Sequence, residues 1–307
     1  ALLLDIPIVK ASEVTADTPL GTGPYSLEDG IGGKHLQRVV GWWCSSDDLV
    51  AKDSSIALVE AESPSQIRDE FEFSGLSVVC TNPQTDSYAD YRCDFELWEV
   101  DSGYLMYIGC NVTWSNFFDD GTLRTFLTYG IDRQTLVDNN YAGLALPTTL
   151  AVSPMSPYYS KSLATNYDYD EMRFIDAASK FRVPTNDKGV PRTLQLLVNS
   201  DDSARLRCAR NIAATLTELG LACETVESPT SVYEARLQAA NYDIYLGITK
   251  LPTTADLSEF YRPWGEMSWG GLANETIYNM VNQSLADRGN YYNLHKLVAD
   301  DGRIIPV

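Results

Sequence analysis

The C-terminal half of the chain alternates short runs of apolar and β-branched residues with segments of helical periodicity, and this alternation limits the possible folds. The strand candidates are residues 193–198, 222–226 and 242–247, and the helix candidates are residues 169–181, 203–219 and 232–239. Strands that alternate with helices predict a mixed α/β sheet with helices on its faces. A Pro/Gly/Trp-rich loop over residues 251–271 follows, and two further helices precede the apolar tail.

The N-terminal part contains shorter elements separated by turns. Ser63 before Pro64 is typical of a helix start, with the serine as N-cap and the proline at the first helical position. A strand over residues 75–79 would complete a β-α-β unit, and residues 97–100 and 104–109 read as two strands around a turn. The remaining candidates are strands at residues 25–27, 37–43 and 55–60, and helices at 121–131 and 132–139.

Length and charge narrow the class of protein. A chain of 307 residues is about twice the ~150 residues that one domain commonly takes, so two packed units are expected. Asp and Glu number 42 against 23 Lys and Arg, giving a net charge of −19. Such a surface repels phosphate backbones, so we expect no nucleic-acid partner. No apolar run approaches the ~20 residues that a membrane-spanning helix needs.

The residues that usually carry chemistry are scarce. His35 and His295 belong to no nucleophile motif, and the six cysteines form no metal-ligand spacing, so we predict no catalytic residue, no metal site and no cofactor. Cys80 with Cys93, and Cys208 with Cys223, are close enough in sequence to form disulfides, but sequence alone does not fix the pairing. Asp132, Asp201 and Asp202 stand at helix starts, where carboxylates cap the first turn.

Three phrases in collinear order carry a family resemblance. They are Gly21-Thr22-Gly23-Pro24-Tyr25, the strand that ends at Cys110-Asn111, and Tyr129-Gly130-Ile131-Asp132-Arg133 with Leu136-Val137. Together with the closing residues 300–307, these phrases resemble the extracellular solute-binding proteins of family 5, the binding components of peptide and nickel ABC importers.

The resemblance implies an α/β fold of the type II periplasmic-binding-protein class, with two lobes of mixed β-sheet flanked by helices. It implies that the chain lacks the N-terminal part of lobe one and the small inserted domain. Residues 1–142 would then form the middle segment of lobe one, residues 143–302 lobe two, and residues 303–307 a strand that returns to lobe one. We therefore expect residues 21–25 and 304–307 to share one sheet region.

The resemblance also implies a ligand site in the loops that face the cleft. Peptide binders of this family place a carboxylate after the strand that corresponds to residues 242–246, and Asp256 is the first candidate to pair with the amino terminus of a ligand. Another alignment puts Thr253 at that position. Trp269 and Gly270 could offer a flat platform, Trp264 could contact ligand or pack in the core, and Asn111 could bind ligand or cap the next turn.

The function implied is that of a non-enzymatic, extracytoplasmic binding component of an ABC importer, which takes an oligopeptide or a similar small solute. Its partners would be the ligand and the permease subunits, and it would act as a monomer that is lipid-anchored in the full-length protein. One alternative is a solute-binding-like sensory domain of a regulator or receptor. Another is a metal-assisted hydrolase that uses Asp256 and Glu259, which no histidine-based ligand set supports.

Overall fold

The computed structural model describes residues 9–16, 19, 21–30, 32–44, 46, 51–61, 63–80, 91–141 and 143–307. The chain divides into two compact units, an N-terminal unit up to residue 96 and a C-terminal unit from residue 97. The assignment of residues 1–142, 143–302 and 303–307 to lobes stays a prediction. In the structure, however, residues 104–110 and 304–306 belong to the same sheet as the strands between residues 194 and 250.

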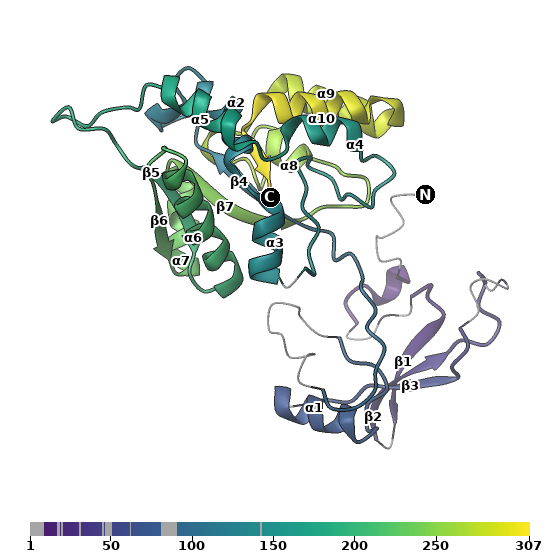
Figure 1. Ribbon diagram of the computed structural model, residues 1–307. Helices are drawn as coiled ribbons and strands as arrows, with labels where there is room; N and C mark the ends of the chain where they lie inside the picture. The colour runs from purple at the N-terminus through teal and green to yellow at the C-terminus, as the bar shows by residue number, and fades with distance from the viewer. Residues whose placement is uncertain are drawn as a thin grey trace. The chain divides into compact units, whose positions relative to one another are not determined.

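The described part of the N-terminal unit contains a three-stranded antiparallel sheet, an α-helix and a short 3-10 helix at Ala11–Glu13. The strands are β1 (Tyr25–Gly30), β2 (Gly33–Arg38) and β3 (Ser55–Ala57), and the helix is α1 (Pro64–Glu72) (Figure 1). Leu27, Leu36 and Ile56 are paired across the three strands, which places them on one face of the sheet. No described residue of this unit is buried, so its described part lacks a core of its own.

Four expectations about strands in and next to this unit are wrong. The strand expected at residues 37–43 ends at Arg38, the last residue of β2, and residues 39–43 form no strand. Residues 75–79 form no strand, because the backbone N–H groups of Gly75 and Leu76 close the C-terminus of α1 by donating to Glu70 O. Residues 97–100 form no strand. Residues 21–25 and 304–307 do not share a sheet, since β1 pairs with β2 whereas β8 (Ile304–Pro306) pairs with β4 (Tyr104–Cys110).

The C-terminal unit is built on a five-stranded mixed sheet in the order β6-β5-β7-β4-β8. The strands β5 (Leu194–Asn199), β6 (Cys223–Ser228) and β7 (Ile244–Lys250) are parallel, and β4 is antiparallel to both of its neighbours. The sheet confirms the mixed α/β fold that the alternation of the sequence predicts.

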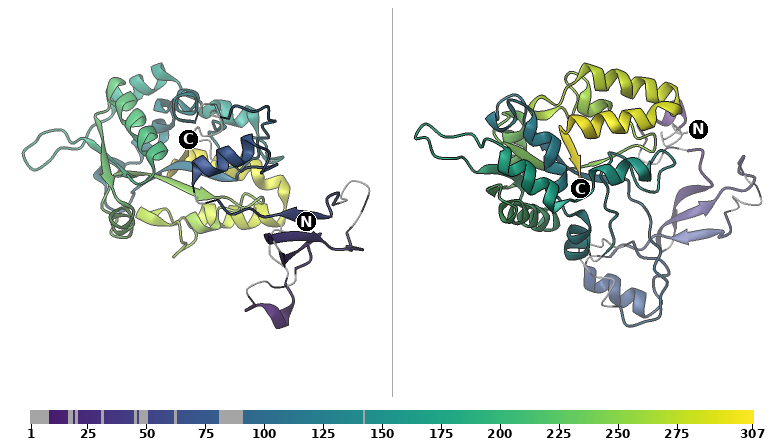
Figure 2. Two further views of the ribbon diagram at one scale, coloured as in Figure 1. Left: turned by 90° about the horizontal axis from the view of Figure 1, so that it is seen from below. Right: turned by 45° about the horizontal axis from the view of Figure 1, so that its top comes forward.

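Helices cover both faces of this sheet (Figure 1, Figure 2). One core cluster includes side chains of α2 (Thr122–Leu127), α3 (Arg133–Tyr141), α5 (Glu171–Lys180) and α6 (Ser203–Glu218). The other includes side chains of α4 (Lys161–Ala164), α7 (Thr230–Gln238), α8 (Ser258–Tyr261), α9 (Glu275–Ala286) and α10 (Tyr291–Asp301). Successive residues of β4 alternate between the two clusters, as the two-residue period of a strand requires: Tyr107 belongs to one and Ile108 to the other.

The helix caps that the sequence predicts are present. The Ser63 hydroxyl accepts a hydrogen bond from Gln66 N at 3.2 Å, and the Asp202 carboxylate accepts one from Arg205 N at 3.0 Å. Asp132 accepts one from Thr135 N at 3.1 Å, ahead of α3. Each side chain satisfies a backbone N–H of the first turn that has no partner within the helix, which explains where these helices begin.

All six cysteines are free thiols, so neither Cys80 and Cys93 nor Cys208 and Cys223 form a disulfide in this structure. Burial raises the pKa of Cys208 to about 11 and that of Cys110 to about 12. Both thiols are therefore protonated at neutral pH, and they fill space in the core rather than act as nucleophiles.

Two tyrosine–glycine pairs pack closely between β4 and β7. Tyr107 lies opposite Gly247 and Tyr245 lies opposite Gly109, and the two tyrosine rings meet edge to face with centroids 5.7 Å apart. A Cβ atom on Gly109 would lie 2.2 Å from the Tyr245 ring, and one on Gly247 would lie 2.6 Å from the Tyr107 ring. Each ring thus occupies the space that a side chain on the opposite residue would need.

Gly109→Ala is expected to lower the free energy of unfolding by about 1–3 kcal/mol, because the new methyl group forces Tyr245 out of a well-packed core. Urea denaturation followed by circular dichroism measures the change. Gly289→Ala is the matched control, since the nearest atom to its Cβ would be Asp287 Oδ1 at 3.4 Å. Equal loss of stability in the two variants would show that the close packing around Gly109 is not the cause.

Candidate functional site

The carboxyl ends of β5, β6 and β7 lie at one edge of the sheet, which we call the carboxyl edge. In open α/β sheets this is the edge at which ligands bind. The first residue of β4 joins it, because β4 runs in the opposite direction and Tyr104 pairs with Lys250. Tyr104 is 60% exposed, so its ring is available at this edge.

A polar network closes the ends of β5 and β6. Thr230 donates to Asp201 Oδ2 through its backbone N–H (2.9 Å) and its hydroxyl (2.8 Å), and Asn199 Nδ2 donates to the Thr230 hydroxyl at 3.0 Å. The two hydrogen bonds from Thr230 lower the pKa of Asp201. The Asp201 carboxylate is consequently used to fasten the start of α7 to the end of β5, as a helix-capping group does.

Asp256 lies in the segment between β7 and α8. Its Oδ1 accepts hydrogen bonds from Ser258 N (2.8 Å) and the Ser258 hydroxyl (2.5 Å). No hydrogen bond reaches its Oδ2 from the described residues. Asp256 is half-buried, so the second oxygen is an anionic acceptor with capacity to spare. Thr253, the alternative position, is exposed in the preceding turn.

Two stacked tyrosines lie next to the segment that carries this carboxylate. The Tyr158 and Tyr291 rings are nearly parallel, with centroids 4.1 Å apart, and the Tyr291 hydroxyl donates to Thr254 O. The pKa of Tyr291 is raised, first by burial, then by Tyr158 and by the negative charge of Asp256. A carboxylate oxygen beside aromatic rings suits a cationic group such as an amine.

Asn111 and Gly270 lie at the opposite end of β7. Asn111 is buried; its Nδ2 donates to Ala240 O (2.7 Å) and Tyr242 O (2.9 Å), and its Oδ1 accepts from Thr113 N and Trp114 N. These bonds use the donors of the side-chain amide. Asn111 therefore serves as the cap of a turn, which is one of the two roles that the sequence allows.

Gly270 packs directly against this turn. Its carbonyl accepts a hydrogen bond from Val112 N at 2.8 Å, its φ is 58°, and a Cβ atom on it would lie 2.5 Å from the Tyr242 hydroxyl. The position thus requires glycine for both its backbone conformation and its close contact. The neighbouring Trp269 is half-buried and packs on the hydrophobic core.

Trp264 is 95% exposed, so the alternative that it packs in the core is wrong. Its φ is +61°, in the left-handed region. For a residue with a side chain this conformation costs roughly 1–2 kcal/mol.

The structure therefore separates the five predicted site residues. Asn111 and Gly270 lie together at the first residue of β7, whereas Asp256 lies in the segment that follows its last residue. Tyr158 and Tyr291 accompany Asp256 but are absent from the sequence prediction. The proline-rich character of residues 142–157 was the available signal that an irregular loop could bring an aromatic side chain there.

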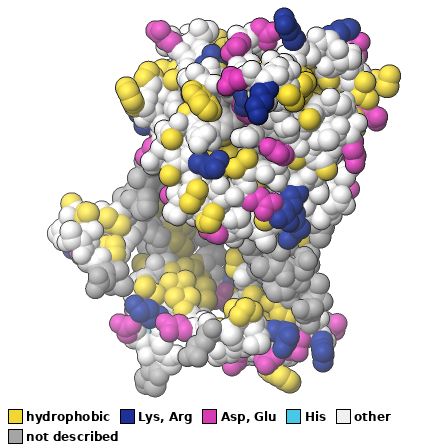
Figure 3. All heavy atoms as spheres, turned by 90° about the vertical axis from the view of Figure 1, so that its left-hand side faces the viewer, with side chains coloured by type: hydrophobic (Ala, Val, Ile, Leu, Met, Phe, Trp, Pro, Cys, Tyr) yellow, Lys and Arg dark blue, Asp and Glu magenta, His cyan; other side chains and the backbone are white. Residues whose placement is uncertain are grey.

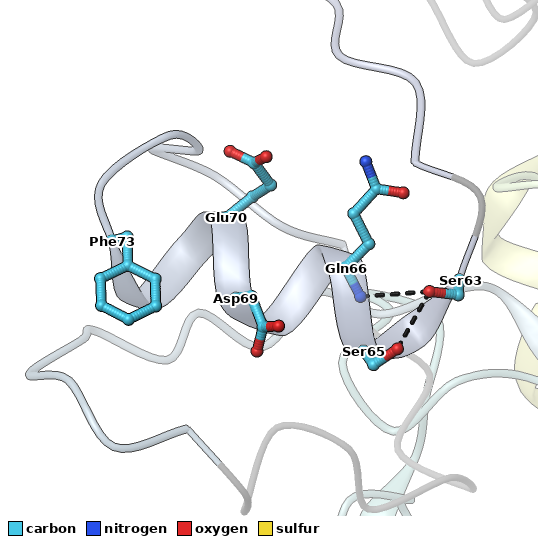
Figure 4. A pocket seen from close by; sticks show the side chains of 6 residues that line it. All are labelled: Ser63, Ser65, Gln66, Asp69, Glu70 and Phe73. Carbon is cyan, nitrogen blue, oxygen red and sulfur yellow. Dashed lines mark hydrogen bonds between the residues drawn. The ribbon is translucent and has the colours of Figure 1, made fainter.

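Two further surfaces do not form a site. A hollow along α1 is lined by Ser63, Gln66, Asp69, Glu70, Phe73 and Ser65, all from one helix and its cap (Figure 4). Ligand sites need groups that converge from several elements, so this hollow offers little. On the face drawn in Figure 3, acidic and basic side chains are scattered among hydrophobic ones. The described residues contain no cluster of His, Cys, Asp and Glu that could hold a metal ion.

The comparison with protein families identifies the class to which this fold and site belong. Residues 5–271 match the family of bacterial extracellular solute-binding proteins, family 5, middle region. The chain belongs to this family, as the resemblance predicts. No curated protein matches the chain. None of the helices in the described part of the chain is long and apolar enough to cross a bilayer.

Several solved structures have a similar fold, and one of them is an ABC transporter substrate-binding protein. The protein CtaP from Listeria monocytogenes aligns with a TM-score of 0.76 at 16% identity, covering 94% of this chain and 60% of its own. The putative peptide-binding protein AppA from Clostridium difficile gives 0.73 at 15%, covering 92% and 60%. NikA from Brucella suis, in complex with Fe(III)-EDTA, gives 0.69 at 16%, covering 95% and 63%. The chain thus spans about 60% of the length of these proteins, and the likeness confirms the type II periplasmic-binding-protein fold.

Proposed function

We propose that this chain is the major part of the extracytoplasmic substrate-binding component of an ABC importer, which takes an oligopeptide or a similar small solute in a cleft between two lobes. The family supports a solute-binding role. A structure of similar fold, AppA from Bacillus subtilis, is an oligopeptide-binding protein in complex with a nonapeptide. No observation favours the sensory alternative.

The observation that carries the proposal is the spare oxygen of Asp256 in the segment after β7, a segment that Tyr291 contacts through its hydrogen bond to Thr254 O. In the proposed complex this oxygen accepts hydrogen bonds from the terminal ammonium group of a peptide, and the tyrosine rings flank it. Trp269 remains a predicted ligand contact. Of the other residues that the sequence predicts, Asn111 and Gly270 are engaged with each other's segments, and Trp264 is 95% exposed.

Asp256→Asn is expected to weaken the binding of a peptide ligand about tenfold or more, because a hydrogen bond to a charged group contributes about 1.5–3 kcal/mol. The ligand is first recovered from a mixture of short peptides by gel filtration with the protein and identified by mass spectrometry. Its affinity is then measured by isothermal titration calorimetry.

Two controls isolate the charge interaction. Ser258→Ala keeps the carboxylate and removes only the hydroxyl that binds Oδ1, so its affinity is expected to stay within threefold of the unchanged chain. N-acetylation of the same peptide removes the amine and should make the unchanged chain and Asp256→Asn bind alike. If acetylation leaves the affinity of the unchanged chain as it was, Asp256 does not recognise the amine.

The remaining parts of the proposal concern the whole protein. Binding is not followed by a chemical step, the protein acts as a monomer, and it delivers its ligand to the permease subunits of the importer. In the full-length protein a lipid anchor holds it at the outer face of the membrane. The family supports an extracellular location, and the scarcity of catalytic groups in the sequence supports binding without turnover.

A further inference from the structure

A tight turn between α8 and α9 presents Trp264 to solvent in a strained conformation. Trp264 has a φ of +61° and is 95% exposed. The left-handed conformation is easy for glycine, and the sequence places a glycine at the next position, Gly265, instead. A scattered exposed apolar side chain needs no explanation, but an indole kept at a position that costs backbone energy does.

Hydrogen bonds to Glu259 hold the turn in one conformation in the unbound protein. The Glu259 carboxylate accepts hydrogen bonds from Arg262 Nε (2.9 Å), Arg262 Nη2 (2.8 Å) and Glu266 N (2.9 Å). Its carbonyl accepts one from Met267 N at 3.1 Å. A Cβ atom on Gly265 would lie 2.1 Å from the Glu259 carbonyl oxygen, so the turn closes tightly on that residue. A rigid turn loses little conformational entropy when its apex is bound.

We propose that Trp264 is an anchor for a protein partner whose surface offers an apolar pocket with a basic rim. A small ligand has most of its surface buried in a concave site, whereas the Trp264 indole is 95% exposed and no described residue encloses it. The partner must therefore supply the pocket. Tryptophan is among the residues that most often dominate the binding energy of protein interfaces.

The charges around the turn favour the basic rim. Arg262 and Glu259 neutralise each other in a two-bond ion pair. The exposed Glu266 forms no ion pair with the described residues, which leaves a negative charge two residues from Trp264. The net charge of −19 makes an anionic lipid surface an unfavourable alternative. The location of the partner in a membrane rests on the proposed function; the anchor itself does not.

The test measures binding of the intact protein to membrane vesicles from the cells that produce it. The vesicles are prepared so that the extracytoplasmic face of the membrane points outward. The unchanged protein is expected to bind, and Trp264→Ala is expected to weaken binding at least tenfold. Trp114→Ala is the matched control, because Trp114 is another largely exposed tryptophan of the same unit, and it should bind as the unchanged protein does. Trp264→Gly also removes the indole, and glycine adopts the left-handed conformation of this position without strain. If Trp264→Gly loses binding but unfolds at the same urea concentration as the unchanged protein, misfolding is excluded as the cause.

Further measurements identify what receives the indole. With p-benzoylphenylalanine in place of Trp264, irradiation should cross-link the protein to a membrane protein of the vesicles, and protease treatment of the vesicles should abolish binding. Equal binding by Trp264→Ala, binding to protein-free liposomes of the same lipids, cross-linking within the chain itself, or no binding by the unchanged protein each overturns the proposal. Peptide affinity is measured in parallel. Loss of peptide binding in Trp264→Ala would assign the indole to the ligand and overturn the proposal. Absence of peptide binding in the unchanged protein would count against the proposed function.

Discussion

Asp243→Asn is expected to lower the free energy of unfolding of the C-terminal unit by about 2–4 kcal/mol. Asp243 lies just before β7, and its carboxylate is almost fully buried. It accepts hydrogen bonds from the Ser115 hydroxyl (2.6 Å), from Arg192 Nη2 (3.1 Å) and from Gln195 N (3.0 Å). An asparagine has one acceptor oxygen in place of two, and its amide N–H groups would face donors that remain buried.

Denaturation in urea measures this loss, and an exposed ion pair provides the comparison. Arg210 and Glu227 make a two-bond pair at 2.8 and 2.9 Å, but both side chains are over a third exposed. Arg210→Gln is expected to cost less than about 1 kcal/mol, since solvent screens such pairs. Should Asp243→Asn unfold at the same urea concentration as the unchanged chain, the buried carboxylate would contribute nothing to joining β5, β7 and the segment before α2.

The elements of the C-terminal unit could be predicted because their signals are local. The strands β5 and β7 are buried on both faces and are short apolar runs, and the helices between them carry caps such as Asp202. In the N-terminal part the same patterns mislead. Residues 97–100 contain Trp98 and Val100, which are 81% and 84% exposed. A strand needs a neighbouring strand, and a pattern of apolar residues does not say whether one is there.

The candidate site could be predicted only in part, for a geometric reason. The sequence places Asp256 after a strand, and that position holds in the structure. It does not reveal that Asn111 and Gly270 lie at the other end of β7, because this depends on β4 being antiparallel to β7 and on the path of the loop that carries Gly270. Tyr158 and Tyr291 meet from segments more than a hundred residues apart, which no local pattern encodes.

Stability of the C-terminal unit is expected to fall by about 3 kcal/mol between pH 6.5 and pH 4 through His295 alone. The imidazole lies in the core on α10, neither ring nitrogen has a hydrogen-bond partner in the described structure, and burial lowers its pKa from 6.5 to about 4. In the unfolded chain the imidazole binds a proton below pH 6.5, whereas in the folded chain it stays neutral down to about pH 4. The contribution of the neutral imidazole is therefore complete above pH 6.5 and is lost as the pH falls, at about 1.4 kcal/mol per pH unit.

His295→Leu removes this titration, so the variant should gain stability over the unchanged chain progressively as the pH falls through that window. The measurement is urea denaturation at half-unit steps of pH, with the difference between the two proteins plotted so that carboxylates common to both cancel. Val298→Ala, a buried change on the same helix, controls for altered packing and should give a pH-independent difference. If the stability difference between His295→Leu and the unchanged chain is also independent of pH, the prediction is wrong. The folded protein would then bind the proton on His295, with the imidazole in contact with solvent or with a hydrogen-bond partner.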